Sequence, residues 1–143
     1  MSEPVILLVE DSEDDVELTL RALRRNAVPG RVEVARDGAA ALDYLLGGTE
    51  AALPSVVLLD LNLPKVSGLE VLERLRAHPR TRLLPVVILT SSREQADLVR
   101  GYALGANSYV RKPVDYDAFQ EAARQLGQYW LQVNEAPPSP AAG

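Results

Sequence analysis

The sequence predicts a doubly wound α/β domain built on a parallel β-sheet. Short apolar runs that suit buried strands alternate with longer stretches in which apolar residues recur at helical spacing. This alternation repeats five times along 143 residues, a length typical of one domain. Because a helix connects each strand to the next, the strands are expected to run parallel, with helices on both faces of the sheet.

The expected strands are short and differ in how apolar they are. After their first residue, 55–59 and 85–89 contain only Val, Ile and Leu, which is typical of strands covered on both faces. Residues 31–35 carry two charges in five positions and suit an edge strand. The five expected strands are 4–9, 31–35, 55–59, 85–89 and 107–110.

The stretches between the strands end in residues that begin or stop helices. Ser12 followed by Asp15 fits an N-terminal capping pattern, and Gly105 fits a C-terminal cap. The five expected helices are 13–26, 38–47, 66–77, 93–104 and 115–133. Right-handed crossovers between parallel strands then predict a (βα)₅ sandwich of the flavodoxin type, with strand order 2-1-3-4-5.

Composition and charge exclude several classes of protein. A net charge of −5 argues against a nucleic-acid partner, which usually requires a basic face. The chain has no cysteine, so disulfides and thiolate metal sites are excluded. No apolar run reaches the length of a membrane span, and the N-terminus lacks the pattern of a signal peptide. We therefore expect a cytoplasmic protein without a membrane partner.

Polar side chains follow the strands that should lie at the centre of the sheet. Glu10 and Asp11 follow the first strand, and Asp60 follows the third. Thr90 and Lys112 follow the fourth and fifth strands. In a sheet of this type the function lies beyond the carboxyl ends of the strands, so we expect these side chains to converge there.

The chemistry of this group follows from its charges. Carboxylates gathered at one edge repel one another, and a hard divalent cation relieves that repulsion. Oxygen ligands without His or Cys point to Mg²⁺, with Asp11 and Asp60 as direct ligands and Glu10 acting through water. Lys112 can pair with Asp60 at rest and with a phosphoryl oxygen later, and the Thr90 hydroxyl can donate to a second oxygen. This arrangement suits phosphoryl transfer.

Four segments resemble the receiver domains of two-component response regulators. They are residues 8–11 (LVED), 58–68 (LLDLNLPKVSG), 88–91 (ILTS) and 105–113 (GANSYVRKP), and the resemblance runs from about 5 to 133. The resemblance implies the receiver fold, and it implies a phosphorylated switch that is not an enzyme. Residues 60–68 and 129–131 are most similar to the small stand-alone regulators paired with phytochrome-type histidine kinases, which implies such a kinase as the partner.

The resemblance also implies a role for each matching residue. Asp60 is the implied phosphoacceptor, and Glu10, Asp11, Asp60 and the backbone carbonyl of Asn62 are the implied Mg²⁺ ligands. Thr90 and Lys112 are the implied residues that bind the phosphoryl group. Tyr109 is the implied switch aromatic, which turns inward when Thr90 moves toward the phosphate. The bond from Lys112 to Pro113 is expected to be cis.

Other interpretations of the same residues are possible. Asp60 alone could cap a helix, and Glu13, Asp14 and Asp15 are expected to be first-turn acids favoured by the helix dipole. A haloacid-dehalogenase-like phosphatase also uses a strand-end Asp, a Thr and a Lys, but it requires a second acid at the position of Asn62. A flavodoxin-like cofactor binder requires a first loop rich in Ser, Thr and Gly, where this chain has acids.

The C-terminal part of the chain predicts a surface for a partner. Phe119, Ala122, Leu126, Tyr129 or Trp130, and Val133 recur at helical spacing, so most of them are expected to form the core stripe of this helix. Tyr129, Trp130 and Leu131 are consecutive, so at least one should be exposed. The resemblance to receivers implies a homodimer through the face made by 93–104, 107–110 and 115–133, and we expect a change of this face on phosphorylation. The alternative is an aromatic side chain partly exposed to solvent with no partner. The folded domain should comprise residues 1–135, and three prolines predict a flexible tail at 136–143.

Overall fold

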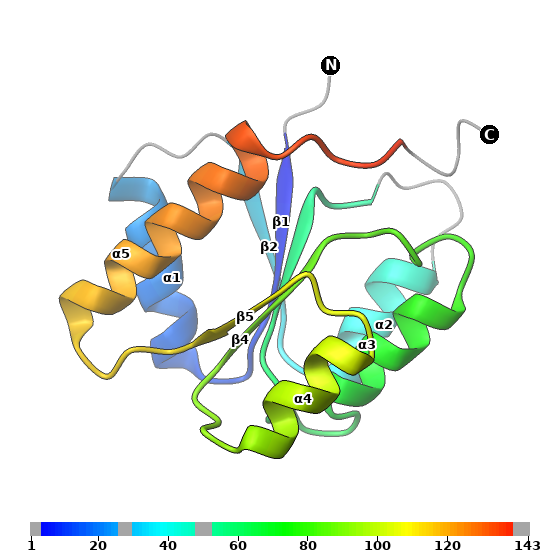
Figure 1. The fold of residues 1–143 in the computed structure, drawn as a ribbon. Helices are drawn as coiled ribbons and strands as arrows, with labels where there is room; N and C mark the ends of the chain where they lie inside the picture. The colour runs from blue at the N-terminus through cyan, green and yellow to red at the C-terminus, as the bar shows by residue number, and fades with distance from the viewer. Residues whose placement is uncertain (1–3, 26–29, 48–52, 139–143) are drawn as a thin grey trace.

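A computed structural model describes residues 4–25, 30–47 and 53–138. The described chain forms a five-stranded parallel sheet with the order β2-β1-β3-β4-β5 (Figure 1). The strands are β1 (Val5–Val9), β2 (Arg31–Ala35), β3 (Val56–Leu59), β4 (Val86–Thr90) and β5 (Ser108–Arg111). The predicted fold class and strand order are confirmed.

Helices cover both faces of the sheet (Figure 1). One face carries α1 (Glu13–Arg25) and α5 (Tyr116–Gln128), which pack against each other. The other carries α2 (Gly38–Leu46), α3 (Gly68–Ala77) and α4 (Gln95–Ala103). Alternate residues of the central strands supply two separate hydrophobic clusters, one on each face, because successive side chains of a strand point in opposite directions.

The predicted ends of the elements differ from the observed ones by one or two residues in most places. Residue 26, the predicted last residue of the first helix, lies outside the described residues. Ser12 does cap α1, since its hydroxyl accepts a hydrogen bond from the Asp15 N–H at 3.3 Å. Gly105 follows α4 with a φ of 106°, and its N–H donates to the Tyr102 carbonyl at 3.0 Å, as expected for a C-terminal cap.

The last predicted helix is the element that differs most. The α-helical part ends at Gln128, and a single π-helical turn, η1 (Tyr129–Val133), follows it. Trp130 and Leu131 pack against the core, whereas Tyr129 is exposed, so the prediction that at least one of these three side chains is exposed is confirmed. Val133, in the π-helical turn, is exposed and is the member of the predicted stripe that does not face the core.

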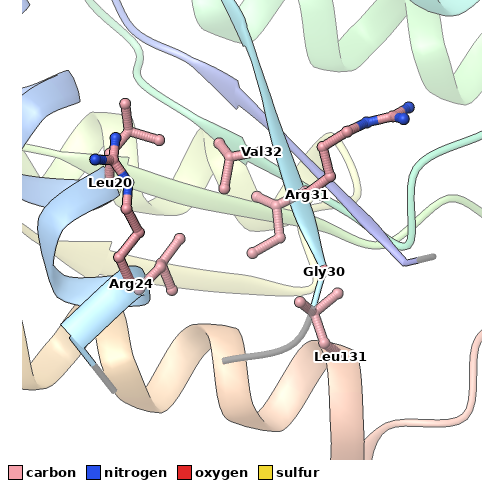
Figure 2. Close-up of a pocket in the computed structure, with 8 residues that line it drawn as sticks. Leu20, Arg24, Gly30, Arg31, Val32 and Leu131 are labelled. Carbon is pink, nitrogen blue, oxygen red and sulfur yellow. The ribbon is translucent and has the colours of Figure 1, made fainter. Parts of the chain in front are cut away.

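The π-helical turn also approaches the edge of the sheet. Leu131 points toward Gly30, at the start of β2, and shares a small cavity with Leu20 and Arg24 of α1 (Figure 2). A Cβ atom at Gly30 would lie 2.7 Å from the Pro4 carbonyl oxygen and 3.0 Å from Leu131 Cδ1. Gly30 also has a φ of 120°, so both its conformation and its surroundings favour glycine.

The described part of the C-terminal segment crosses the amino-terminal end of the sheet (Figure 1). Residues 136–138 line a cavity together with residues near the starts of β3 and β4, among them Leu83 and Pro85. Among the described residues, no helix is long and apolar enough to cross a membrane.

Arg76, near the end of α3, joins two loops at the amino-terminal end of the sheet. Its guanidinium donates to the Gly105 carbonyl at 3.0 Å, just after α4, and to Asn107 Oδ1 at 3.0 Å. It also donates to the Leu84 carbonyl at 2.8 Å, just before β4. The carboxyl end of α4 is thereby attached to α3 and to the start of β4.

Candidate functional site

Three carboxylates meet at the carboxyl-terminal edge of the sheet. Glu10 and Asp11 follow β1, and Asp60 follows the neighbouring strand β3. One oxygen from each of the three lies within 4.8 Å of the others. Glu10 and Asp60 are buried, whereas Asp11 is exposed. The predicted convergence of these acids is therefore confirmed, and it leaves one side of the group open to solvent.

Backbone hydrogen bonds hold these residues at the ends of their strands. The Glu10 N–H donates to the Ala35 carbonyl at 3.0 Å, and the Asp60 N–H donates to the Val9 carbonyl at 3.0 Å. The start of α3 lies directly against Asp60. A Cβ atom at Gly68 would lie 2.2 Å from the Asp60 carbonyl oxygen, so only glycine permits this approach.

Lys112 reaches the same group from the end of β5. Its ammonium hydrogen-bonds to Glu10, to Asp15 Oδ2 at 2.8 Å and to Asp60 Oδ2 at 3.4 Å. Burial by itself lowers the pKa of Lys112, but the hydrogen bonds that it donates to Asp15 and Glu10 and the charge of Asp60 outweigh it and raise the pKa to about 12. Lys112 is therefore a permanent positive charge among the acids.

The pKa of Glu10 is also raised, which in a carboxyl group favours the neutral form. Its burial raises the pKa to about 7, the Lys112 ammonium opposes this increase, and the nearby charge of Asp60 adds to it. Burial is the main cause of this increase, and the Lys112 ammonium only partly offsets it. A cation placed among these oxygens would favour the ionised form of Glu10.

The donor set fits a divalent metal ion. The three clustered side chains offer carboxylate oxygens alone, and the chain has no cysteine. Hard cations such as Mg²⁺, Ca²⁺ and Mn²⁺ take oxygen ligands of this kind, whereas zinc and copper prefer sites that include nitrogen or sulfur. The mixture of two buried acids and one exposed acid leaves room for the waters that a small cation retains.

Thr90 ends β4, the strand between β3 and β5, and is fully buried. Its hydroxyl accepts a hydrogen bond from the Ser92 N–H at 3.3 Å. Ser92 in turn donates its own hydroxyl proton to Asp97 Oδ2 at 2.6 Å, in the first turn of α4. On the other side of the site, the Asn62 N–H donates to Asp60 Oδ1 at 3.4 Å.

The sequence profile of the response regulator receiver domain matches residues 6–124. The chain belongs to this family. A curated relative of this receiver, the probable methanogenesis regulatory protein FilR2 of Methanothrix harundinacea, is 44% identical over 135 residues, which are 93% of this chain and 87% of FilR2. The family assignment leaves the phosphatase alternative without support.

Solved structures of other receivers agree with this assignment. The phosphorylated cyanobacterial phytochrome response regulator RcpA is 34% identical, with a TM-score of 0.89 and coverage of 96% of this chain and all of RcpA. The Mn²⁺-bound form of Rcp1 is 34% identical, with a TM-score of 0.87 and coverage of 94% and 99%. The bacteriophytochrome response regulator RtBRR is 50% identical, with a TM-score of 0.73 and coverage of 96% and 86%.

Tyr109 lies on β5 of the receiver, against α4. Its ring centroid is 6.4 Å from that of Tyr102, and Gly101 of α4 leaves space for the ring. The Tyr109 hydroxyl is buried near Ser92 and Asp97 without a hydrogen bond of normal geometry. Burial raises the pKa of Tyr109, so the hydroxyl keeps its proton.

One expectation about the end of β5 is wrong in this structure. The described residues contain no cis peptide bond, so the Lys112–Pro113 bond is trans. A proline favours the trans form by only a small margin, and the resemblance to the family, not the residues around the bond, implied the cis form.

Asp15 is the site residue that the sequence analysis missed. It was expected to act only as a first-turn acid of the first helix, together with Glu13 and Asp14. It does lie in the first turn of α1, but its carboxylate also contacts Lys112. No local pattern in the sequence indicates this contact, because it depends on how α1 lies relative to the end of β5.

Proposed function

We propose that Asp60 accepts a phosphoryl group from a histidine kinase and that the receiver signals through the resulting change in its surface. The observation that carries this proposal is the convergence of Asp60 with Glu10, Asp11 and Lys112 at one edge of the sheet. A buried carboxylate that contacts a single ammonium and faces an acidic, partly open group is suited to attack phosphorus. Such transfers depend on positioning and charge.

The residues of this chain have distinct tasks in the transfer. An Asp60 oxygen forms a bond to phosphorus while the bond from phosphorus to the histidine nitrogen of the kinase breaks. Lys112 exchanges its hydrogen bond to Asp60 for one to a phosphoryl oxygen and remains protonated. The Thr90 hydroxyl, which accepts from the Ser92 N–H at rest, turns to donate to a second phosphoryl oxygen. The metal ion, when bound, neutralises charge on the phosphoryl oxygens.

We propose Mg²⁺ as the ion, held by Glu10, Asp11, Asp60 and the backbone carbonyl of Asn62. Mg²⁺ keeps several waters and commonly uses one or two carboxylates beside a phosphate. The exposed side of the cluster at Asp11 supports such a partly hydrated ion. The Mn²⁺-bound form of Rcp1 supports a divalent ion in this family.

The output surface in this proposal is the face of α4, β5 and α5. Thr90 is linked to the start of α4 through Ser92 and Asp97, and Tyr109 packs on the same helix. Movement of the Thr90 hydroxyl toward a phosphoryl group would break the first of these links. We propose that Thr90 and Tyr109 together form the switch that alters this face.

The same face is our candidate for a homodimer. Val99 and Tyr102 of α4 are large apolar side chains that are more than half exposed, and β5 is an edge strand. A second copy of the chain on this face would cover these two side chains and the free edge of β5. Replacement of Val99 with Asp should abolish a dimer measured by sedimentation, whereas Leu83→Asp, at an equally exposed residue outside α4, β5 and α5, should not. A protein that stays monomeric at all concentrations would contradict the dimer.

The kinase partner in this proposal is of the phytochrome type and works with the receiver in the cytoplasm. The names of RcpA and RtBRR support this input. We propose that residues 1–135 form the receiver and that the protein has no enzymatic output of its own. Of the tail predicted at 136–143, residues 139–143 lie outside the described residues.

Incubation with Mg²⁺ and acetyl phosphate tests the central proposal. We expect the intact protein to gain about 80 Da, the mass of one added phosphoryl unit, in a form labile to hydroxylamine. Asp60→Asn and the removal of Mg²⁺ with a chelator should each abolish the gain. Asp115→Asn, which removes an equal charge at the cap of α5, should retain it.

Two results would contradict the proposal. Asp60→Asn that is still phosphorylated would exclude Asp60 as the acceptor. Continuous release of phosphate from acetyl phosphate without a stable adduct would instead indicate a hydrolase.

A further inference from the structure

The ammonium of Lys112 is fully engaged by carboxylates. It has three N–H donors, and three acids accept from it: Glu10, Asp15 and Asp60. The contact with Asp60 Oδ2, at 3.4 Å, is the longest of the three. Lys112 therefore leans away from Asp60 and toward the loop and helix that follow β1.

Asp15 is held in place to make its contact. Its N–H donates to the Ser12 hydroxyl at 3.3 Å, and its carbonyl accepts from the Thr19 hydroxyl at 2.8 Å. The side chain is 28% exposed, whereas that of Lys112 is 7% exposed. Asp15 thus comes from the rim of the site and reaches inward to a nearly buried ammonium.

Asp15 also lies outside the three clustered metal-site acids. The group of oxygens close enough to share one ion comprises Glu10, Asp11 and Asp60. Two of these acids, Glu10 and Asp60, are both Lys112 partners and candidate metal ligands, so a bound cation competes with Lys112 for them. Asp15 is the Lys112 partner that does not belong to this group of candidate metal ligands, so a bound cation would leave its contact with Lys112 in place.

We propose that Asp15 is a positioning residue for phosphoryl transfer, which tethers the Lys112 ammonium on the α1 side while the Asp60 contact is exchanged for a phosphoryl oxygen. This inference rests on the proposed function of Asp60. The tether keeps one N–H of Lys112 paired throughout the exchange, so that the ammonium turns about a fixed contact. Without it, a flexible four-carbon side chain must find the phosphoryl oxygen from several rotamers.

The lysine content of the chain allows a direct test in the metal-free protein. The chain has two lysines, Lys65 and Lys112, so selective nitrogen-15 labelling of lysine produces two side-chain ammonium signals. The Lys65 side chain is 68% exposed, so its protons exchange rapidly with water and its signal should be weak. The signal of Lys112 should be sharp because three carboxylates hold its protons.

Asp15→Asn should shift or broaden the Lys112 signal. The matched control is Asp14→Asn, which removes the same charge from the same turn of α1 at an exposed side chain. It should leave the Lys112 signal unchanged. A Lys112 signal that responds equally to both substitutions, or to neither, would overturn the proposed tether.

Phosphorylation by acetyl phosphate provides the second readout. Asp15→Asn should slow the reaction about tenfold, as expected when a catalytic charge loses its orientation. Asp14→Asn should change the rate less than about twofold. In a Lys112→Ala protein, adding Asp15→Asn should cause less than about a twofold further change, because Asp15 acts through Lys112.

The outcomes separate the two proposals. A wild-type protein that gains no phosphoryl group would contradict the proposed function itself. A wild-type protein that is phosphorylated, with Asp15→Asn as fast as Asp14→Asn, would contradict only the role of Asp15. An additive effect of Asp15→Asn in the Lys112→Ala protein would also contradict it, because Asp15 would then act independently of Lys112. Asp15→Ala, which lacks the amide group that Asp15→Asn introduces, should have the same effect as Asp15→Asn.

Discussion

Helices α3 and α4 cover the same face of the sheet and have similar lengths, but they are attached to it very differently. α3 buries Gly68, Val71, Leu72 and Leu75. Of the residues of α4, Gly101 alone is buried. The N-terminal cap of α3 is the Ser67 hydroxyl, which accepts from the Glu70 N–H at 3.3 Å, whereas Glu94 makes no side-chain cap for α4.

This difference indicates which helix can respond to the site. Elements with few buried apolar contacts open at lower free energy than the rest of a domain. α3 is fixed against Asp60 through Gly68 and forms part of the scaffold. α4 depends instead on local contacts, chiefly the Ser92–Asp97 hydrogen bond and the packing of Gly101 on Tyr109. A small change at Thr90 can therefore reach α4 without disturbing α3.

The largest expected difference between the helices lies in their apolar side chains. Leu72→Ala should lower the free energy of unfolding by about 2–5 kcal/mol, because Leu72 is fully buried and its removal leaves a cavity. Leu98→Ala, at a half-buried position of α4, should cost about 1 kcal/mol. Urea denaturation measures both values. Equal losses of unfolding free energy at the two positions would contradict the conclusion that α3 is packed more deeply than α4.

A smaller difference is expected at the helix caps. Ser67→Ala removes the cap of α3 and should cost about 1 kcal/mol, since a backbone N–H loses its partner. Glu94→Ala should cost less than about 0.5 kcal/mol, because the Glu94 side chain makes no cap hydrogen bond. Thermal unfolding of the two variants compares them, and a larger loss for Glu94→Ala would show that α4 has a cap of another kind.

Gly101→Ala has two opposing effects on stability, and their sum should be small. Alanine increases helix propensity by about 1 kcal/mol, but its Cβ would lie 2.7 Å from Ile88 Cδ1 and 3.2 Å from the Tyr109 ring. These effects oppose each other, so stability should change by less than about 1 kcal/mol while the ring of Tyr109 moves. Fluorotyrosine NMR detects the movement.

Ala103→Gly is the matched control for this helix. It changes the propensity of α4 in the opposite sense at an exposed residue and should leave the Tyr109 signal in place. A Tyr109 signal that ignores Gly101→Ala would show that the ring does not depend on this close approach.

The strands and the acids at their ends could be predicted from the sequence because each depends on local patterns. Apolar runs determine the strands, and the fold then brings Glu10, Asp11 and Asp60 to one edge. The contact between Asp15 and Lys112 could not be predicted in this way. It depends on the angle at which α1 leaves β1, which is set by packing of α1 against α5.

The last helix also shows where prediction from local sequence patterns stops. Apolar spacing at 119–133 correctly predicts a helix that packs on the core. It assumes one helical period throughout, and the change to a π-helical turn at Tyr129 alters which residues face inward. Whether the Lys112–Pro113 bond is cis or trans also depends on tertiary contacts, because proline alone permits both.

The hydrogen bonds of Arg76 determine how α4 can move. Because the guanidinium holds the Gly105 carbonyl, the carboxyl end of α4 is anchored to the most deeply packed helix on that face. The opposite end is attached mainly through Ser92. Any displacement of a helix restrained in this way would be smallest at Gly105 and would increase toward Gln95, so a partner bound near residues 95–99 would detect it best.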